Sequence, residues 1–95
     1  MAIEMVFEEN EVICWYDEDG MYHNPTAPAV ITIGGEVHWM KHGQQHREDG
    51  PSSMYPNGKL EWCLNGIQYL DMDEYLYHLK ATKEVEERIR RHFGR

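Results

Sequence analysis

Residues 51–62 read Pro51-Ser52-Ser53-Met54-Tyr55-Pro56-Asn57-Gly58-Lys59-Leu60-Glu61-Trp62, and they predict a β-hairpin. Two runs of extended character flank Asn57-Gly58, the dipeptide most typical of a type I′ turn. On the second run Leu60 and Trp62 share a face, because side chains alternate along a strand. Pro51 stands where the first strand begins, one of the few sheet positions that tolerate proline. The stretch therefore predicts an antiparallel pair with a tryptophan on its buried face.

The hairpin belongs to a series, because its landmarks recur at a nearly constant spacing. Trp15, Trp39 and Trp62 stand 24 and 23 residues apart, and a proline precedes each of the last two by eleven residues. The first unit carries one extra residue within 17–20. This insertion shifts the landmarks that follow it, so that His23 aligns with His46. Such a shared shift is hard to produce by chance, and it indicates an internal tandem repeat.

The repeat predicts an antiparallel β-meander over residues 1–70, with Trp15, Trp39 and Trp62 as its buried structural core. Gly34-Gly35 is expected to turn the chain as Asn57-Gly58 does, and His42-Gly43 and Asn65-Gly66 mark the following reversals. Residues 1–10, in which Ile3, Met5 and Phe7 alternate, supply a partial unit at the start.

Residues 71–95 are expected to form one or two helices that cover the open end of the repeats. Asp71 with Glu74 forms a capping-box pattern, Thr82 can cap a second helix, and Gly94 ends it. Three pairs at i, i+4 are expected to neutralise the second helix: Glu84–Arg88, Glu86–Arg90 and Glu87–Arg91. The predicted fold class is α+β, in a single domain of 95 residues (1–95).

The charge of the chain is unevenly distributed. Residues 1–79 hold fourteen acids and three bases, which leaves −11, whereas residues 80–95 carry +3, within a net charge of −8. A broad acidic face disfavours direct binding to nucleic acid or to an anionic membrane. No signal peptide or membrane span is expected. Two cysteines give neither a disulfide framework nor a CxxC pair, so a cytoplasmic location is predicted.

A resemblance to a known family rests on four motifs: His46-Arg47-Glu48-Asp49-Gly50-Pro51, Tyr55-Pro56-Asn57-Gly58, Glu61-Trp62 and Asn65-Gly66. They resemble the tandem hairpin repeats of small proteins from bacteriophages and other large DNA viruses, and are distantly similar to MORN repeats. Residues 36–69 carry the match, the first unit departs from it at 23–28, and the third decays at 69–71. The resemblance implies a phage or prophage origin and a place in the host cytoplasm. It further implies a short accessory protein that binds and disables a host protein.

Three histidines are candidates for chemistry and are interpreted as structural. His38, His42 and His46 fall at i, i+4 and i+8, but a strand and a turn do not present that spacing as a helix would, so no metal site is predicted. His38 is expected to be solvated. His46 with Asp49 could serve a hydrolase, yet both belong to the repeat motif and no catalytic motif accompanies them. The sequence therefore predicts a protein that is not an enzyme and needs no cofactor.

The cysteines leave two interpretations open. Cys14 and Cys63 adjoin tryptophans and so lie on the face opposite the tryptophan side chains. They are free thiols if that face is solvated, and small apolar fillers if it is covered.

The candidate partner-binding residues are acids and tyrosines in two clusters, one in the enlarged first-unit turn and one at the start of the helical region: Tyr16, Asp17, Glu18, Asp19 and Tyr22, and Asp71, Asp73, Glu74 and Tyr77. Tyrosine edged by acid is typical of a protein-binding patch that attracts a basic partner. The predicted function is inhibition of a host defence or nucleic-acid-handling protein by direct binding. The alternatives are a sponge for a nucleotide or cyclic dinucleotide, and a DNA mimic of antirestriction type. The open sheet edge also allows a homo-oligomer.

Overall fold

The computed structural model describes the backbone of residues 4–7 and 13–94, and the side chains of 13–94. The fold is α+β, with antiparallel strands and two helices. Ile3 and residues 8–12 of the expected first unit lie outside the described residues. The strands of the main sheet follow the order β1-β2-β3-β4-β7-β8-β9, every neighbour antiparallel. Their bounds are β1 (Glu4–Phe7), β2 (Ile13–Tyr16), β3 (Val30–Ile31), β4 (Val37–His38), β7 (Ser53–Met54), β8 (Leu60–Leu64) and β9 (Ile67–Tyr69).

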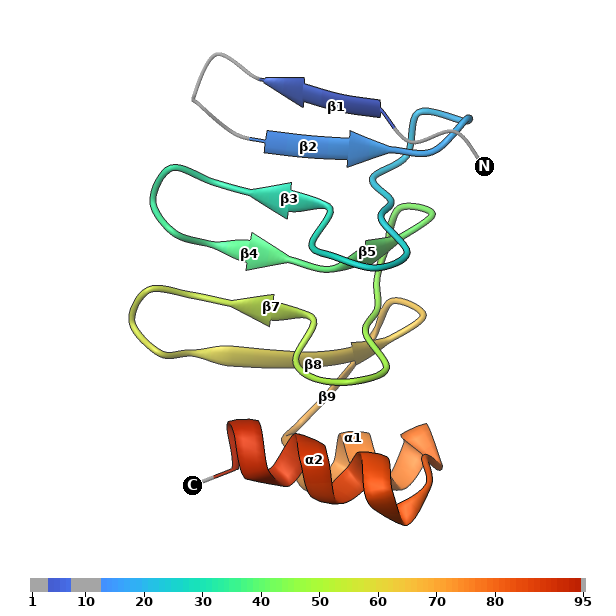
Figure 1. Ribbon diagram of the computed structural model, residues 1–95, viewed down its shortest axis with the longest axis vertical. Helices are drawn as coiled ribbons and strands as arrows, with labels where there is room; N and C mark the ends of the chain where they lie inside the picture. The colour runs from blue at the N-terminus through green and yellow to red at the C-terminus, as the bar shows by residue number, and fades with distance from the viewer. Residues whose placement is uncertain (1–3, 8–12, 95) are drawn as a thin grey trace.

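The hairpins lie one above another, and the helices cover the lower end of the stack (Figure 1). A small second pair, β5 (Met40–Lys41) with β6 (Gln44–Gln45), stands beside the main sheet. The described part of the molecule measures 39 × 30 × 20 Å. Among the described residues, no helix has the length and apolar character that crossing a membrane requires.

The spacing seen in the sequence recurs in the backbone hydrogen bonds. The Trp15 N–H donates to the Ala29 carbonyl at 2.8 Å, and the Trp39 N–H donates to the Ser52 carbonyl at 2.6 Å. Three further backbone bonds recur 23 residues later in the chain. Ala29 N–His38 O recurs as Ser52 N–Glu61 O, Asn24 N–Met40 O recurs as Arg47 N–Cys63 O, and Gly43 N–Tyr22 O recurs as Gly66 N–Gln45 O. Successive units therefore share one hydrogen-bonded backbone frame.

Two kinds of turn alternate along the chain, and the prediction of type I′ geometry at Asn57-Gly58 and Gly34-Gly35 is wrong. In each dipeptide only the second residue has a positive φ, +91° at Gly58 and +95° at Gly35. The Gly58 N–H bonds to the Tyr55 carbonyl at 2.9 Å, which makes a three-residue loop with a glycine bulge. Two consecutive positive φ angles, as a type I′ turn requires, occur instead at His42-Gly43 and Asn65-Gly66.

The repeat histidines hold these two-residue turns in place. The His42 amide donates to Nδ1 of His23 at 3.0 Å, and the Asn65 amide donates to Nδ1 of His46 at 2.8 Å. His42 and Asn65 each adopt a left-handed backbone conformation, which is unfavourable for residues that carry a Cβ. The histidine bond offsets part of that strain, because it satisfies an amide that the turn leaves without a strand partner. Each histidine thus joins one unit to the next.

The remainder of the 46–51 motif packs against the helical end. The Arg47 guanidinium lies 4.0 Å from the centre of the Trp39 ring and 5.5 Å from that of Phe93. Its Nε donates to Asp49 at 2.8 Å. A Cβ on Gly50 would stand 2.8 Å from the Phe93 ring and 2.9 Å from Arg47, so only glycine leaves room for this arrangement.

Both helices begin where the sequence predicts. Helix α1 (Met72–Leu79) is capped by Asp71, which accepts from the Glu74 amide, and α2 (Lys83–Phe93) is capped by Thr82. Gly94 ends α2. Of the three expected ion pairs along α2, only Glu86–Arg90 forms among the described residues, at 3.2 Å, and Arg90 also bonds Asp73 at 2.8 Å.

The apolar core lies between the last unit and the helices. Trp62 and Leu64 of β8 pack against Tyr75, Leu76 and Ile89 of the helices. Trp15 and Trp39, predicted to be buried with Trp62, are only partly buried. They differ from Trp62 because no helix covers the upper units, as Figure 1 shows.

Of the two interpretations of the cysteines, the structure supports the one in which their face of the sheet is covered. Cys14 and Cys63 are both buried. The Cys63 thiol donates to Gln45 at 3.4 Å, and burial raises its pKa. Both side chains therefore act as small fillers of the sheet.

Candidate functional site

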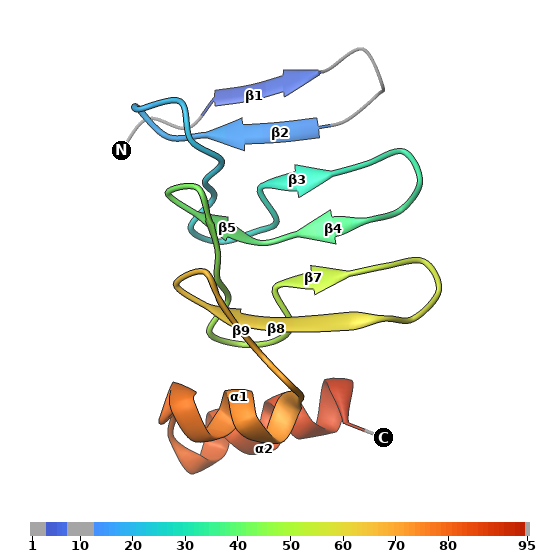
Figure 2. The same ribbon diagram turned by 180° about the vertical axis from the view of Figure 1, so that it is seen from behind.

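The most exposed apolar surface lies on helix α1 and the end of β9. Leu70 is 87% exposed and Tyr77 is 77% exposed. The neighbouring Tyr69 ring stacks on His78 with ring centres 4.6 Å apart, and the Tyr77 and His78 rings lie nearly perpendicular with centres 5.2 Å apart. We name this surface, formed by Tyr69, Leu70, Glu74, Tyr77 and His78, the α1 face; helix α1 lies in front in Figure 2.

The acids predicted at this end all have local partners. The Asp71 carboxylate caps α1, and Asp73 pairs with Arg90. Glu74 accepts from the Leu70 amide at 3.1 Å. All three remain exposed to solvent, so their charge still contributes to the field around the α1 face.

Asp17, predicted as a partner-binding residue at the surface, is instead buried. Its side chain is only 4% exposed and bonds to His42 at 2.7 Å. It also accepts from the amides of Asp19 and Met21. The His42 hydrogen bond is the main reason that the pKa of Asp17 lies below its ordinary value. Asp17 therefore shapes the enlarged turn and holds the next unit.

The other residues of the first-unit turn stay near the surface. Tyr16 stacks on Tyr22 with ring centres 5.1 Å apart, while Glu18 and Asp19 are exposed. This turn adjoins β2 at the upper end of the stack, opposite the helices, as Figure 1 shows. The two predicted clusters consequently do not form one continuous surface.

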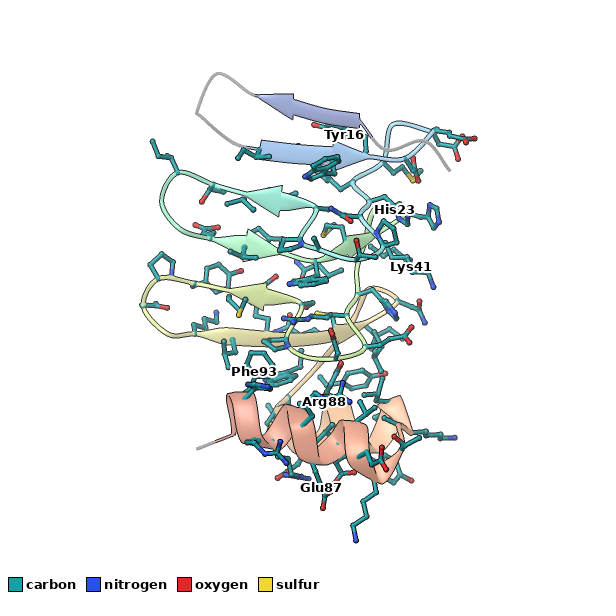
Figure 3. The ribbon with its side chains drawn as sticks, in the orientation of Figure 1. Tyr16, His23, Lys41, Glu87, Arg88 and Phe93 are labelled. Carbon is teal, nitrogen blue, oxygen red and sulfur yellow. The ribbon has the colours of Figure 1, made fainter. Side chains whose placement is uncertain are left out.

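A basic groove, which the sequence did not predict, lies beside the repeats on the side of α2. It has a volume of about 540 Å³ and brings together three strong bases, three histidines, two acids and an apolar lining that includes Trp39, Met40 and Val85. The bases are Lys41, Arg47 and Arg88, and the histidines are His23, His42 and His46. Figure 3 shows Arg88 on the side of α2 that faces the hairpins and Glu87 on the opposite side.

The two acids of the groove are already engaged. Asp49 accepts from Arg47, and Glu48 bonds His46 at 2.8 Å. Lys41 and Arg88, in contrast, form no ion pair with any described residue. The groove is thus a basic spot in an acidic chain. No sequence pattern predicts it, because its residues come from four separate segments.

The histidine geometry offers little to a hydrolase. In His46, Nδ1 accepts the Asn65 amide and Nε2 contacts Glu48, so both ring nitrogens are occupied. The prediction that His38 is solvated is wrong, since its ring contacts Ser53 at 2.8 Å and Glu36 at 3.2 Å. Within the part of the chain that the structure describes, no three potential ligands gather as a metal site would require.

Comparison with protein-family models, with curated proteins and with solved structures found no match to this chain.

Proposed function

We propose that the protein is a binding module of phage type that inhibits a host protein by docking its α1 face on a basic surface of that partner. The observation that carries the proposal is the strong exposure of two large apolar side chains at this end of the molecule. Leu70, just before α1, is 87% exposed, and Tyr77, on α1, is 77% exposed. Burying a side chain of this size contributes about 1.5–3 kcal/mol. Tyrosine is also among the residues that dominate binding energy at interfaces.

The charge around the α1 face supports a basic partner. Asp71 and Glu74 are exposed beside Leu70 and Tyr77, and residues 1–79 together carry −11. Such a field accelerates encounter with a positively charged surface and disfavours acidic ones. A DNA mimic would need a continuous row of carboxylates, whereas the candidate acids gather at opposite ends of the stack.

The repeats serve this proposal as a rigid frame. Tandem hairpin repeats of the phage type, and the more distant MORN repeats, build a surface without fixing an activity. Of the motif residues, His46 holds the turn of the next unit, whereas Arg47 and Gly50 lie against Phe93 of α2. The proposal therefore places the host contact on the α1 face, assigns no reaction, and locates the protein in the host cytoplasm.

Site-specific photo-crosslinking tests the proposal. A photoreactive phenylalanine derivative replaces Tyr77 in one variant and Ile33 in the other, and each is expressed in host cells. Ile33 is a matched control because it is 71% exposed and lies in the β3–β4 loop, far from the helices (Figure 1). We expect one host protein to crosslink at position 77 and not at position 33.

Two substitutions then test whether the contact has the proposed chemistry. Leu70→Ser should reduce the position-77 adduct at least tenfold, and Glu74→Gln should reduce it more at low salt than at high salt. Glutamine preserves an acceptor for the Leu70 amide while it removes the charge. Equal adducts at positions 33 and 77, or adducts that Leu70→Ser leaves unchanged, would exclude the α1 face as the docking surface.

A further inference from the structure

The basic groove can hold an anion, because two of its strong bases are unengaged. Lys41 on β5 and Arg88 on α2 line it from different elements, and neither pairs with a described acid. The groove acids are already hydrogen-bonded, Glu48 to His46 and Asp49 to Arg47. An anion in the groove would therefore meet free positive charge.

The walls of the groove are held rigidly. His23 and His42 stack with ring centres 4.0 Å apart, and the His42 amide bonds to His23. On the opposite side Arg47 is fixed between Trp39 and Phe93 and donates to the Pro51 carbonyl at 3.3 Å. A preformed site of this kind loses little freedom when it binds a ligand.

The lining combines positive charge with apolar and aromatic area. Trp39, Met40 and Val85 contribute the apolar part. Guanidinium and ammonium groups are the side chains that recognise phosphate, and aromatic or apolar surface accepts a planar ring. The volume of about 540 Å³ lies within the range of small-molecule sites, roughly 300–1,000 Å³.

We propose that the basic groove binds a nucleoside monophosphate, with its phosphate attracted by the charge of Lys41 and Arg88 and its base against the Trp39, Met40 and Val85 lining. The site is separate from the α1 face, which is formed by other residues. Burial is the main reason that the pKa of His23 lies below its ordinary value; His42 and Lys41 lower this pKa further, and Asp17 opposes them.

Isothermal titration of the full chain with AMP tests the proposal. We expect saturable binding below about 1 mM that weakens as salt is raised. Adenosine and inorganic phosphate, titrated separately, should each bind at least tenfold more weakly than AMP. Phosphate that binds as tightly as AMP would overturn the assignment of an organic ligand, and adenosine that binds as tightly would overturn the role of the bases.

Charge-removing variants locate the site. Lys41→Gln and Arg88→Gln should each weaken AMP binding about fivefold to tenfold, and both side chains are exposed, so the variants should unfold at the wild-type temperature. Lys83→Gln is the matched control, an exposed base of α2 outside the groove. Leu70→Ser should leave AMP binding intact, which separates this site from the α1 face. No saturable AMP binding, or an equal loss in Lys83→Gln, would overturn the proposal.

Discussion

The histidines that mark the repeat serve as acceptors for backbone amides, and this constrains their protonation. His23 is 3% exposed, and its Nδ1 receives the His42 amide. A nitrogen that accepts such a bond cannot carry a proton, so the neutral ring has its hydrogen on Nε2. Burial is the main cause that lowers the pKa of His23 below 6.5, and repulsion from His42 adds to it.

A pH dependence of stability follows from His23. The unfolded chain binds a proton on this ring near pH 6.5, whereas the folded chain binds it only at lower pH, so protonation favours unfolding. The free energy of unfolding should therefore fall as pH drops from about 6.5 toward the folded pKa. Urea unfolding between pH 8 and pH 5 measures this.

The variant His23→Gln isolates the effect. It should be less stable than wild type at pH 8, because the His42 amide loses its acceptor, and its stability should change less between pH 7 and pH 5. His92→Gln, at an exposed position near the end of α2, is the control and should keep the wild-type slope. A wild-type slope in His23→Gln would contradict the account.

Among the elements, the hairpin loops show how adjacent glycines can differ. Gly35 has a φ of +95°, and a Cβ on it would stand 3.2 Å from Pro56, whereas Gly34 has no positive φ and meets only Thr32 at 3.8 Å. Gly35→Ala should therefore cost about 1–2 kcal/mol. Gly34→Ala should be neutral or stabilise by up to about 1 kcal/mol, since alanine restricts the unfolded chain. Thermal unfolding distinguishes the two, and equal losses would restore the type I′ interpretation.

The contact between repeats and helices includes one buried hydroxyl group. Tyr75 is fully buried, its hydroxyl donates to the Arg47 carbonyl, and burial raises its pKa to about 12. Tyr75→Phe leaves that carbonyl without its partner and should destabilise the fold by about 1–3 kcal/mol. Tyr77→Phe is the control, and because Tyr77 is exposed it should change stability by less than about 0.5 kcal/mol. Similar losses in both variants would contradict this role for Tyr75.

Across the whole molecule, the units differ in how they are stabilised. The core cluster of Trp62, Leu64, Tyr75, Leu76 and Ile89 joins the last unit to the helices. The upper units are held mainly by recurring hydrogen bonds. In a stacked repeat each unit contacts only its neighbours, so stability can vary along the stack. Native-state hydrogen exchange should show stronger protection in β8, α1 and α2 than in β3 and β4. Uniform protection would argue for a single cooperative core.

Part of the frame was predictable from the sequence, because several recurring landmarks take part in corresponding backbone bonds. Trp15 corresponds to Trp39 in this way and Gly43 to Gly66, and Asp71 and Thr82 predict the helix starts. The turn types were missed because an Asn-Gly pair suits both a two-residue turn and a three-residue loop with a bulge. Asp17 was misplaced because an acid in a turn can face solvent or bond its own backbone.

The basic groove could not be predicted from the sequence in this way. Its cations without an ion pair to a described residue, Lys41 and Arg88, stand 47 positions apart in the sequence and line one groove only because the units stack on α2. The expected pair Glu84–Arg88 would have neutralised Arg88, but it does not form. Ion pairs at i, i+4 on an exposed helix contribute only about 0.2–0.5 kcal/mol. The i, i+4 spacing therefore does not ensure that a given pair forms.

The most direct test of the proposed function is the affinity of the purified host protein that crosslinks at position 77. Its dissociation constant should be measured with wild type, with the double variant Leu70→Ser/Tyr77→Ser, and with Ile33→Ser. We predict that the double variant binds at least a hundredfold more weakly, since two buried anchors are lost, whereas Ile33→Ser binds as wild type does. A double variant that binds with wild-type affinity would contradict the account.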